Sequence, residues 1–139
     1  MARQAFMFMA KDPVCINIDL DLKSIAKKFN KTQLSHLLVT DESNKLQGVI
    51  SRNDLLEEFA SLLLLSSGKT YSDLELKSKK ASDIMTKDPY VVKKEDSIDL
   101  AIEYLLQKSF HCVPVLEEHK PVGILTAFDL LKGYYQEYG

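Results

Sequence analysis

Apolar positions along this chain change their spacing in a fixed order. Residues 14–18 form a short run rich in β-branched side chains, which is typical of a strand. The next segment has apolar residues at helical spacing, and Asp21 stands where a helix cap is expected. Two more apolar runs, 37–40 and 46–51, lie on either side of a polar turn and predict a pair of strands. A helix is then expected from about Asp54.

The second half of the chain repeats this order. Strands are expected at 90–92, 113–116 and 122–126, and Ser97 is expected to cap the helix between the first two. A last helix is expected from about residue 129. The pattern in each half is therefore strand, helix, strand, strand, helix.

Two short motifs return at matching places in the two halves. Met-Ala-Lys-Asp-Pro at 9–13 returns as Met-Thr-Lys-Asp-Pro at 85–89. Gly-Val-Ile-Ser-Arg-Asn-Asp at 48–54 returns as Gly-Ile-Leu-Thr-Ala-Phe-Asp at 123–129. An internal repeat restricts the fold more than any single motif does. We therefore predict an α/β fold in which two βαββα repeats pack about a pseudo-twofold axis.

Length and composition indicate one module built from both repeats. A chain of 139 residues suits a single compact domain, and each repeat alone is at the small end of what folds independently. Residues 1–65 are expected to form the first repeat and 83–139 the second. The segment 66–82, which is polar and rich in Ser, Gly and Lys, is expected to be a linker.

The charge and the hydropathy pattern exclude several classes of protein. A net charge of −2 argues against a protein that coats nucleic acid. No segment approaches the roughly 18 apolar residues of a membrane span, and the apolar run at the N-terminus is too short for a signal peptide. Cys15 and Cys112 lack Cys-x-x-Cys spacing and are interpreted as reduced, buried thiols. We expect a cytoplasmic protein that binds neither nucleic acid nor membrane.

A hydroxyl residue stands three places before an Asp in both copies of the glycine-bearing motif: Ser51 before Asp54, and Thr126 before Asp129. Unpaired N–H groups at a helix N-terminus suit a phosphate, and a carboxylate there can accept hydrogen bonds from ribose hydroxyls. Arg52 adds a cation beside the first copy. The same spacing is also that of a capping box, which a single occurrence would favour. Two occurrences at equivalent positions favour a nucleotide site.

The order of these motifs resembles a tandem pair of cystathionine-β-synthase (CBS) domains. The resemblance extends from about Phe8 to Tyr134 and rests on Met-Thr-x-x-Pro at 85–89, Phe-His-Cys-Val-Pro-Val at 110–115 and the two Asp motifs. It implies a non-catalytic regulatory module that binds AMP, ADP or ATP in clefts between the repeats and signals by a conformational change. It also implies a homodimer and a separate effector protein of unknown identity.

The resemblance further implies two composite clefts. The better-matched cleft is expected to use Ser51, Arg52, Asn53, Asp54, Thr86, Val91, Phe110, His111, Cys112 and Pro114. The second is expected to use Ala10, Cys15, Leu34, Ser35, His36, Leu38, Thr126, Phe128 and Asp129. The second cleft departs from the family pattern because Ala10 lacks a hydroxyl and Leu38 replaces a proline. We therefore expect the first cleft to dominate nucleotide binding.

Two other functions remain open: a ligand-free dimerisation or scaffold module, and a sensor of S-adenosylmethionine or a dinucleotide. Neither an enzyme nor a resident cofactor is expected, because no catalytic motif is present. His36, His111 and Cys112 offer zinc ligands, but their spacing matches no zinc motif, so no metal site is expected.

The helix expected at 54–65 is apolar on more than one side. A helix of this kind usually contacts a second surface, which predicts a subunit interface there. The apolar stripe consists of Leu55, Leu56, Phe59, Leu62 and Leu63.

Overall fold

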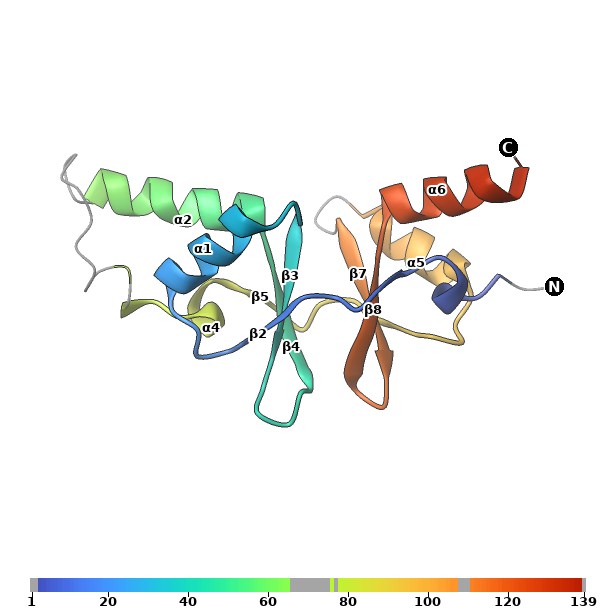
Figure 1. Cartoon of the computed structure of the whole chain (residues 1–139), viewed down its shortest axis with the longest axis horizontal. Helices are drawn as coiled ribbons and strands as arrows, with labels where there is room; N and C mark the ends of the chain where they lie inside the picture. The colour runs from blue at the N-terminus through green and yellow to red at the C-terminus, as the bar shows by residue number, and fades with distance from the viewer. Residues whose placement is uncertain (1–2, 66–75, 77, 108–110, 139) are drawn as a thin grey trace. The chain divides into compact units, whose positions relative to one another are not determined.

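The strands of the described residues form two four-stranded sheets, each in its own compact unit (Figure 1). The computed structural model describes residues 3–65, 76, 78–107 and 111–138. Unit 1 comprises Met1–Val14, Asn44–Leu46 and Asp88–Gly139. Unit 2 comprises Cys15–Ser43 and Gln47–Lys87.

The sheet of unit 2 has the strand order β2-β3-β4-β5. These strands are β2 (Cys15–Asn17), β3 (His36–Thr40), β4 (Leu46–Ser51) and β5 (Thr86–Lys87). β2 and β3 are parallel and are connected through helix α1 (Leu22–Lys31), as a parallel pair requires a crossover. Helices α1, α2 (Arg52–Leu65) and α4 (Ala81–Ile84) lie on one side of this sheet (Figure 1).

Helix α1 is fixed at its start and along one face. The side chain of Asp21 accepts a hydrogen bond from the amide of Ser24 at 2.8 Å, so the predicted cap is confirmed. Leu22, Ile25 and Phe29, which share one face of the helix, are buried in the core.

The sheet of unit 1 has the strand order β1-β8-β7-β6. Its strands are β1 (Ala10–Lys11), β6 (Val92–Lys93), β7 (Cys112–Glu117) and β8 (Lys120–Thr126). Helices α5 (Ile98–Leu105) and α6 (Ala127–Tyr138) and the 3₁₀ turn η1 (Ala5–Met7) complete the unit. Ser97 caps α5, because its hydroxyl accepts a hydrogen bond from the amide of Asp99 at 3.2 Å. Buried side chains from η1, β6, α5, β7 and β8 form its core: Ala5, Val92, Ala101, Val113, Val115 and Leu125.

The α/β class and the two βαββα repeats are confirmed, with β2-α1-β3-β4-α2 in the first repeat and β6-α5-β7-β8-α6 in the second. The short strands β1 and β5 were not predicted. Each extends the sheet formed by the other repeat, since β1 pairs antiparallel with β8 and β5 pairs antiparallel with β4. Helix α4 begins at Ala81, inside the segment expected to be linker, of which residues 66–75 and 77 lie outside the described residues. The packing about a pseudo-twofold axis stays a prediction.

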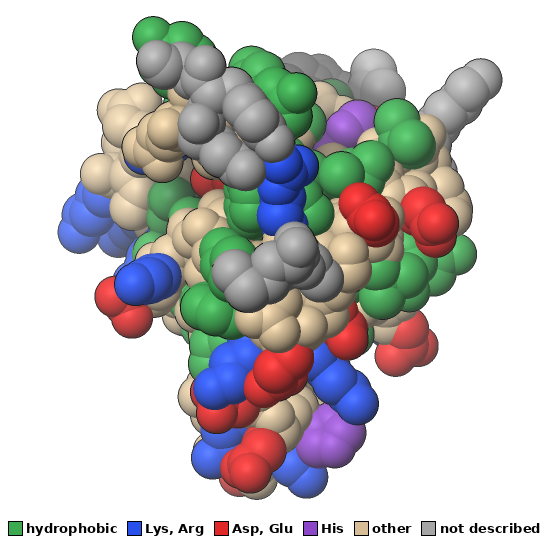
Figure 2. Space-filling view, turned by 90° about the vertical axis from the view of Figure 1, so that its right-hand side faces the viewer, with side chains coloured by type: hydrophobic (Ala, Val, Ile, Leu, Met, Phe, Trp, Pro, Cys, Tyr) green, Lys and Arg blue, Asp and Glu red, His purple; other side chains and the backbone are tan. Residues whose placement is uncertain are grey.

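Charges of both signs are intermixed over the lower part of the face shown in Figure 2, and apolar side chains reach the surface in its upper part. This distribution fits the small net charge of the sequence. Among the residues that the structure describes, no helix combines the length and the apolar character needed to cross a bilayer.

Candidate functional site

Ser51 and Asp54 bond each other's main chain at the junction of β4 and α2. The amide of Ser51 donates to Asp54 Oδ2 at 2.8 Å, and the amide of Asp54 donates to Ser51 Oγ at 3.0 Å. This reciprocal arrangement is a capping box, which satisfies two amide groups at the start of the helix.

Thr126 and Asp129 form the equivalent arrangement where β8 leads into α6. Asp129 Oδ2 accepts hydrogen bonds from both the amide and the hydroxyl of Thr126, each at 2.9 Å. The amide of Asp129 donates to Thr126 Oγ1 at 3.3 Å. The repeat is therefore preserved at the level of individual hydrogen bonds.

The capping-box interpretation is thus confirmed at both helices, and it engages Oδ2 of each aspartate. Within the described part of the chain, Oδ1 of Asp54 and Oδ1 of Asp129 accept no hydrogen bond. Both residues are half-buried, so each box leaves one carboxylate oxygen able to accept hydrogen bonds from another molecule. A ligand contact at these oxygens stays a prediction.

Arg52 has a structural role that the sequence did not indicate. Its Nε donates to the carbonyl of Leu34 at 2.5 Å, and its Nη2 donates to the carbonyls of Phe29, at 2.7 Å, and of Thr32. The guanidinium carbon also lies 5.3 Å from the centre of the Phe29 ring. Arg52 therefore caps the C-terminus of α1, where carbonyl groups lack helical partners and a positive charge is favourable.

The other residues expected in the better-matched cleft differ in exposure. Asn53, Thr86 and His111 are exposed and Val91 is half-buried, whereas Cys112 and Pro114 are buried. Phe110 lies outside the described residues.

Those expected in the second cleft also divide by exposure. Ala10, Leu34, Ser35 and Phe128 are exposed, Cys15 and His36 are half-buried, and Leu38 is only 1% exposed. Cys112, Pro114 and Leu38 therefore present little side-chain surface to a ligand.

Several expected site residues are neighbours within a unit. In unit 2, Cys15 pairs with Leu38 across β2 and β3, and the amide of Arg52 donates to the carbonyl of Ser35 at 2.9 Å. In unit 1, Cys112 pairs with Thr126 across β7 and β8.

Burial raises the pKa of the Cys15 thiol above its ordinary value. A raised pKa keeps the thiol protonated at neutral pH, which does not suit a nucleophile or a metal-binding thiolate. Among the described residues, no group of three or more His, Cys, Asp or Glu side chains is placed to hold a metal ion.

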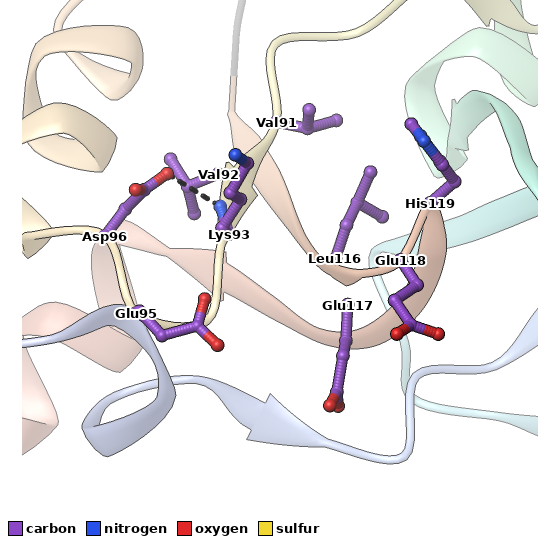
Figure 3. Close-up of a pocket in the computed structure, with 9 residues that line it drawn as sticks. All are labelled: Val91, Val92, Lys93, Glu95, Asp96, Leu116, Glu117, Glu118 and His119. Carbon is purple, nitrogen blue, oxygen red and sulfur yellow. Dashed lines mark hydrogen bonds between the residues drawn. The ribbon is translucent and has the colours of Figure 1, made fainter.

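A cavity of about 620 Å³ lies in unit 1 between the start of β6 and the β7–β8 hairpin (Figure 3). The carboxylates of Glu95, Glu117 and Glu118 line its lower side in the view of Figure 3, and Leu116 and Val91 contribute apolar surface. Because like charges repel, this cavity suits the phosphates of a nucleotide poorly. Its complete lining is Val91, Val92, Lys93, Glu95, Asp96, Leu116, Glu117, Glu118 and His119.

The sequence analysis did not predict a site at this cavity, and of the expected site residues the lining includes Val91 alone. The strand spacing places residues 91–96 and 116–119 side by side, since Val92 pairs with Val115. The expected strands at 90–92 and 113–116, with a helix between them, were the sequence signal for this parallel pairing.

Comparison with known proteins places the chain among relatives of similar length and among parts of larger proteins. The family model described as CBS domain matches residues 3–61 and 81–135. An uncharacterized protein of Methanocaldococcus jannaschii is 26% identical over 144 residues, which cover 88% of this chain and 86% of that protein. Inosine-5'-monophosphate dehydrogenase of the same organism is 25% identical over 131 residues, which cover 94% of this chain but 23% of the enzyme.

The fold matches that of a solved CBS-pair protein over its whole length. The crystal structure of CBSX2 in complex with AMP gives a TM-score of 0.80 at 26% identity, covering 99% of each chain. CBSX2 is a CBS-pair protein from Arabidopsis thaliana.

Proposed function

This chain belongs to the CBS domain family, and from that premise we propose that it is a regulatory module that binds an adenosine-containing ligand. The observation that carries the proposal is the pair of equivalent boxes, Ser51 with Asp54 and Thr126 with Asp129, each of which leaves Oδ1 of its Asp able to accept hydrogen bonds. The complex of CBSX2 with AMP supports this class of ligand.

In the proposed binding mode, Oδ1 of the aspartate accepts hydrogen bonds from the ribose hydroxyls. Amide groups near the start of the helix and the positive end of its dipole face the phosphate. Side-chain donors of Arg52 already bond three carbonyls among the described residues, so the phosphate depends mainly on main-chain groups. The two sets of residues expected from the sequence remain the proposed sites around Asp54 and Asp129, and the site around Asp54 is the stronger.

An Asp54→Asn variant separates the cap from the ligand contact. The asparagine carbonyl oxygen keeps the hydrogen bond from Ser51, while its NH₂ group replaces the outward oxygen. We expect the free energy of unfolding to change by less than about 0.5 kcal/mol, and the affinity for AMP in calorimetry to fall about tenfold, which is the effect of losing one or two hydrogen bonds.

A Ser51→Ala variant changes the other half of the same box. It removes the hydroxyl half of the box and is expected to lower stability by about 1 kcal/mol, as the loss of a helix cap does. AMP affinity that is unchanged in Asp54→Asn would contradict the proposed ribose contact.

A ligand-free scaffold is the alternative, because the boxes observed here also explain both aspartates as helix caps. A thermal-shift panel of AMP, ADP, ATP and S-adenosylmethionine distinguishes the two. A ligand present at 100 times its Kd stabilises the folded state by about 2.7 kcal/mol, whereas a scaffold shows no shift with any of them. A shift with S-adenosylmethionine alone would identify the protein as a sensor of S-adenosylmethionine.

We also propose that the protein is a cytoplasmic homodimer without catalytic activity, which passes its signal to a separate effector protein. Exposed leucines at equivalent positions support the dimer: Leu56 on α2 is 65% exposed, and Leu131 on α6 is 68% exposed. An apolar position repeated on two helices suits a second copy of the same chain. Sedimentation should show a dimer for the wild type and a monomer for Leu131→Glu, and a wild-type monomer at micromolar concentration would contradict it.

A further inference from the structure

We propose that Phe6 and Met7 of unit 1, together with two adjoining hollows in the same unit, form a docking surface for the effector protein. The surface takes an effector segment that carries an apolar side chain beside a lysine or an arginine. This inference rests on one part of the proposed function, the separate effector, and gives the chemistry by which the effector is recognised. All of its residues belong to unit 1.

The two units contain equivalent segments that are held in the same way. Residues 5–9, which include η1, match residues 81–85, which include α4. Ala5 and Ala81, at the starts of these segments, are both 0% exposed. Because the two segments have the same structural purpose, each serves as a comparison for the other. Their main-chain hydrogen bonds match pair by pair: Ala5 to Asp96 as Ala81 to Leu20, Phe6 to Lys94 as Ser82 to Ile18, and Ile98 to Arg3 as Leu22 to Lys79.

The side chains of Phe6 and Met7 are not needed for that structural purpose. Phe6 is 41% exposed and Met7 is 51% exposed, whereas their counterparts in unit 2 are Ser82 and Asp83. Asp83 also accepts a hydrogen bond from the amide of Lys80 at 2.8 Å, for which Met7 has no carboxylate. Two adjacent apolar side chains at the surface, where the same fold accepts polar ones, indicate contact with another molecule.

A hollow of about 310 Å³ continues the apolar surface from Phe6. Phe6, Met9 and Val122 supply its apolar lining. The position equivalent to Val122 in the first repeat is Gln47, so an apolar side chain of unit 1 again corresponds to a polar one in unit 2. The hollow therefore suits an apolar side chain of a partner, in the manner of an interface anchor. The rest of its lining is Lys94, Glu95 and Glu117.

This hollow adjoins the acidic cavity of Figure 3, because Glu95 and Glu117 line both. Glu117 pairs with Lys94 at 2.9 Å, whereas Glu95 and Glu118 form no ion pair among the described residues. The excess of negative charge favours a cationic side chain next to the apolar one and disfavours an acidic segment. Over the two hollows, four carboxylates lie beside two ammonium groups: Glu95, Asp96, Glu117 and Glu118 beside Lys93 and Lys94.

Peptide selection on the full chain tests the chemistry of the occupant. Short random peptides displayed on phage are selected on the wild type, and those that also bind the double variant Phe6→Ser with Met7→Asp are removed. This variant places the side chains of the equivalent unit 2 segment in unit 1, so its unfolding midpoint should be no lower than that of the wild type. We expect the remaining peptides to share an apolar residue beside Lys or Arg.

Calorimetry with one synthetic peptide of the enriched sequence measures each contribution. The double variant should lower the affinity for this peptide about tenfold or more, as the loss of apolar anchors does. Glu95→Gln leaves the pair of Lys94 and Glu117 in place and should lower the affinity about threefold at low salt, with less effect at high salt. Leu106→Ser is the matched control, because Leu106 is 78% exposed and lies outside the surface. It should leave the affinity unchanged.

Three results would overturn the inference: no peptide that distinguishes the wild type from the double variant, enriched peptides without Lys or Arg, or equal losses of affinity in Leu106→Ser and the double variant. A dimeric wild type with a monomeric double variant would also overturn it, because a second copy of the chain would then occupy the surface. Binding of AMP separates these results from failure of the adenosine site. The double variant should bind AMP as the wild type does, and a wild type that binds the peptide but no AMP, ADP or ATP would contradict the adenosine site alone.

Discussion

Met85 lies against Gly48 so closely that a methyl group added to this glycine would be 2.6 Å from Met85 Sδ. Met9 has the same relationship with Gly123, where the distance would be 2.3 Å. These contacts give a physical reason for the two motifs that recur in the sequence, because the methionine of one motif requires the glycine of the other. They also hold the short strands β1 and β5 against β8 and β4.

Gly123→Ala and Gly48→Ala should each lower the free energy of unfolding by about 2 kcal/mol, within the range for overpacking of a core. The two sites should differ in how much of this loss is recovered when the methionine is also replaced by alanine. At Gly123 the remaining neighbour is the carbonyl of Ala10 at 3.0 Å, whereas at Gly48 it is the carbonyl of Thr86 at 2.7 Å. Main-chain atoms yield less readily than the end of a methionine side chain.

Double-mutant cycles measured by urea denaturation check this difference. The favourable coupling energy between Gly123→Ala and Met9→Ala should exceed that between Gly48→Ala and Met85→Ala. Additive effects at both pairs would show that the methionines are not what excludes a Cβ.

Glu118 and His119 form the tight turn between β7 and β8 with positive φ angles of 52° and 69°. Two consecutive positive φ values are typical of a type I′ turn, in which Asn-Gly is strongly preferred and bulky residues are strained. The double substitution Glu118→Asn with His119→Gly should therefore stabilise the protein by about 1 kcal/mol or more. The midpoint of urea unfolding should rise without a change in the m-value.

The turn between β3 and β4 provides the control for this effect. Asn44 also has a positive φ, of 62°, but asparagine tolerates this conformation. Asn44→Ala should be destabilising, so the two turns are expected to respond in opposite directions. A lower midpoint for the Asn-Gly variant would show that contacts of the Glu118 or His119 side chain outweigh backbone strain.

Arg52→Lys should lower the free energy of unfolding by about 2 kcal/mol, because hydrogen bonds from a charged group contribute about 1.5–3 kcal/mol each and lysine replaces only part of them. Thr32→Val at the same helix end should cost less than about 1 kcal/mol, since it removes one neutral hydrogen bond at an exposed position. Urea denaturation of the two variants gives both values. Equal losses would mean that the cap at the end of α1 does not depend on the guanidinium.

The sequence was sufficient for the elements that a local pattern specifies. The spacing of Leu22, Ile25 and Phe29 predicted α1 and its buried face, and Asp21 and Ser97 were correctly identified as helix caps. It was insufficient for β1 and β5, each of which has two residues and depends on a partner strand far away in the chain. So short a strand has no periodicity of its own to detect.

The same distinction applies to the candidate site. The repeated hydroxyl and Asp identified both helix starts, because the spacing alone determines that Ser51 can bond Asp54. The role of Arg52 could not be found in this way, since its partners Phe29, Thr32 and Leu34 are brought to it by the packing of α1 beside α2. A charged residue beside a helix start looks the same in the sequence whether it faces a ligand or a neighbouring helix end.

The stability of the protein should fall at alkaline pH in part because of Cys15. Burial raises the pKa of this thiol in the folded state above its value in the unfolded chain. The contribution of the protonated Cys15 thiol to the free energy of unfolding is fully present below the pKa of the unfolded state. It is lost as the pH rises through the pKa of the folded state, because the unfolded state releases the proton first. Urea midpoints measured from pH 7 to pH 10 should fall more steeply in the wild type than in Cys15→Ala. Any packing loss in the variant shifts its whole curve equally, so the slope is the readout, and parallel curves would show that the Cys15 thiol has the same pKa in both states.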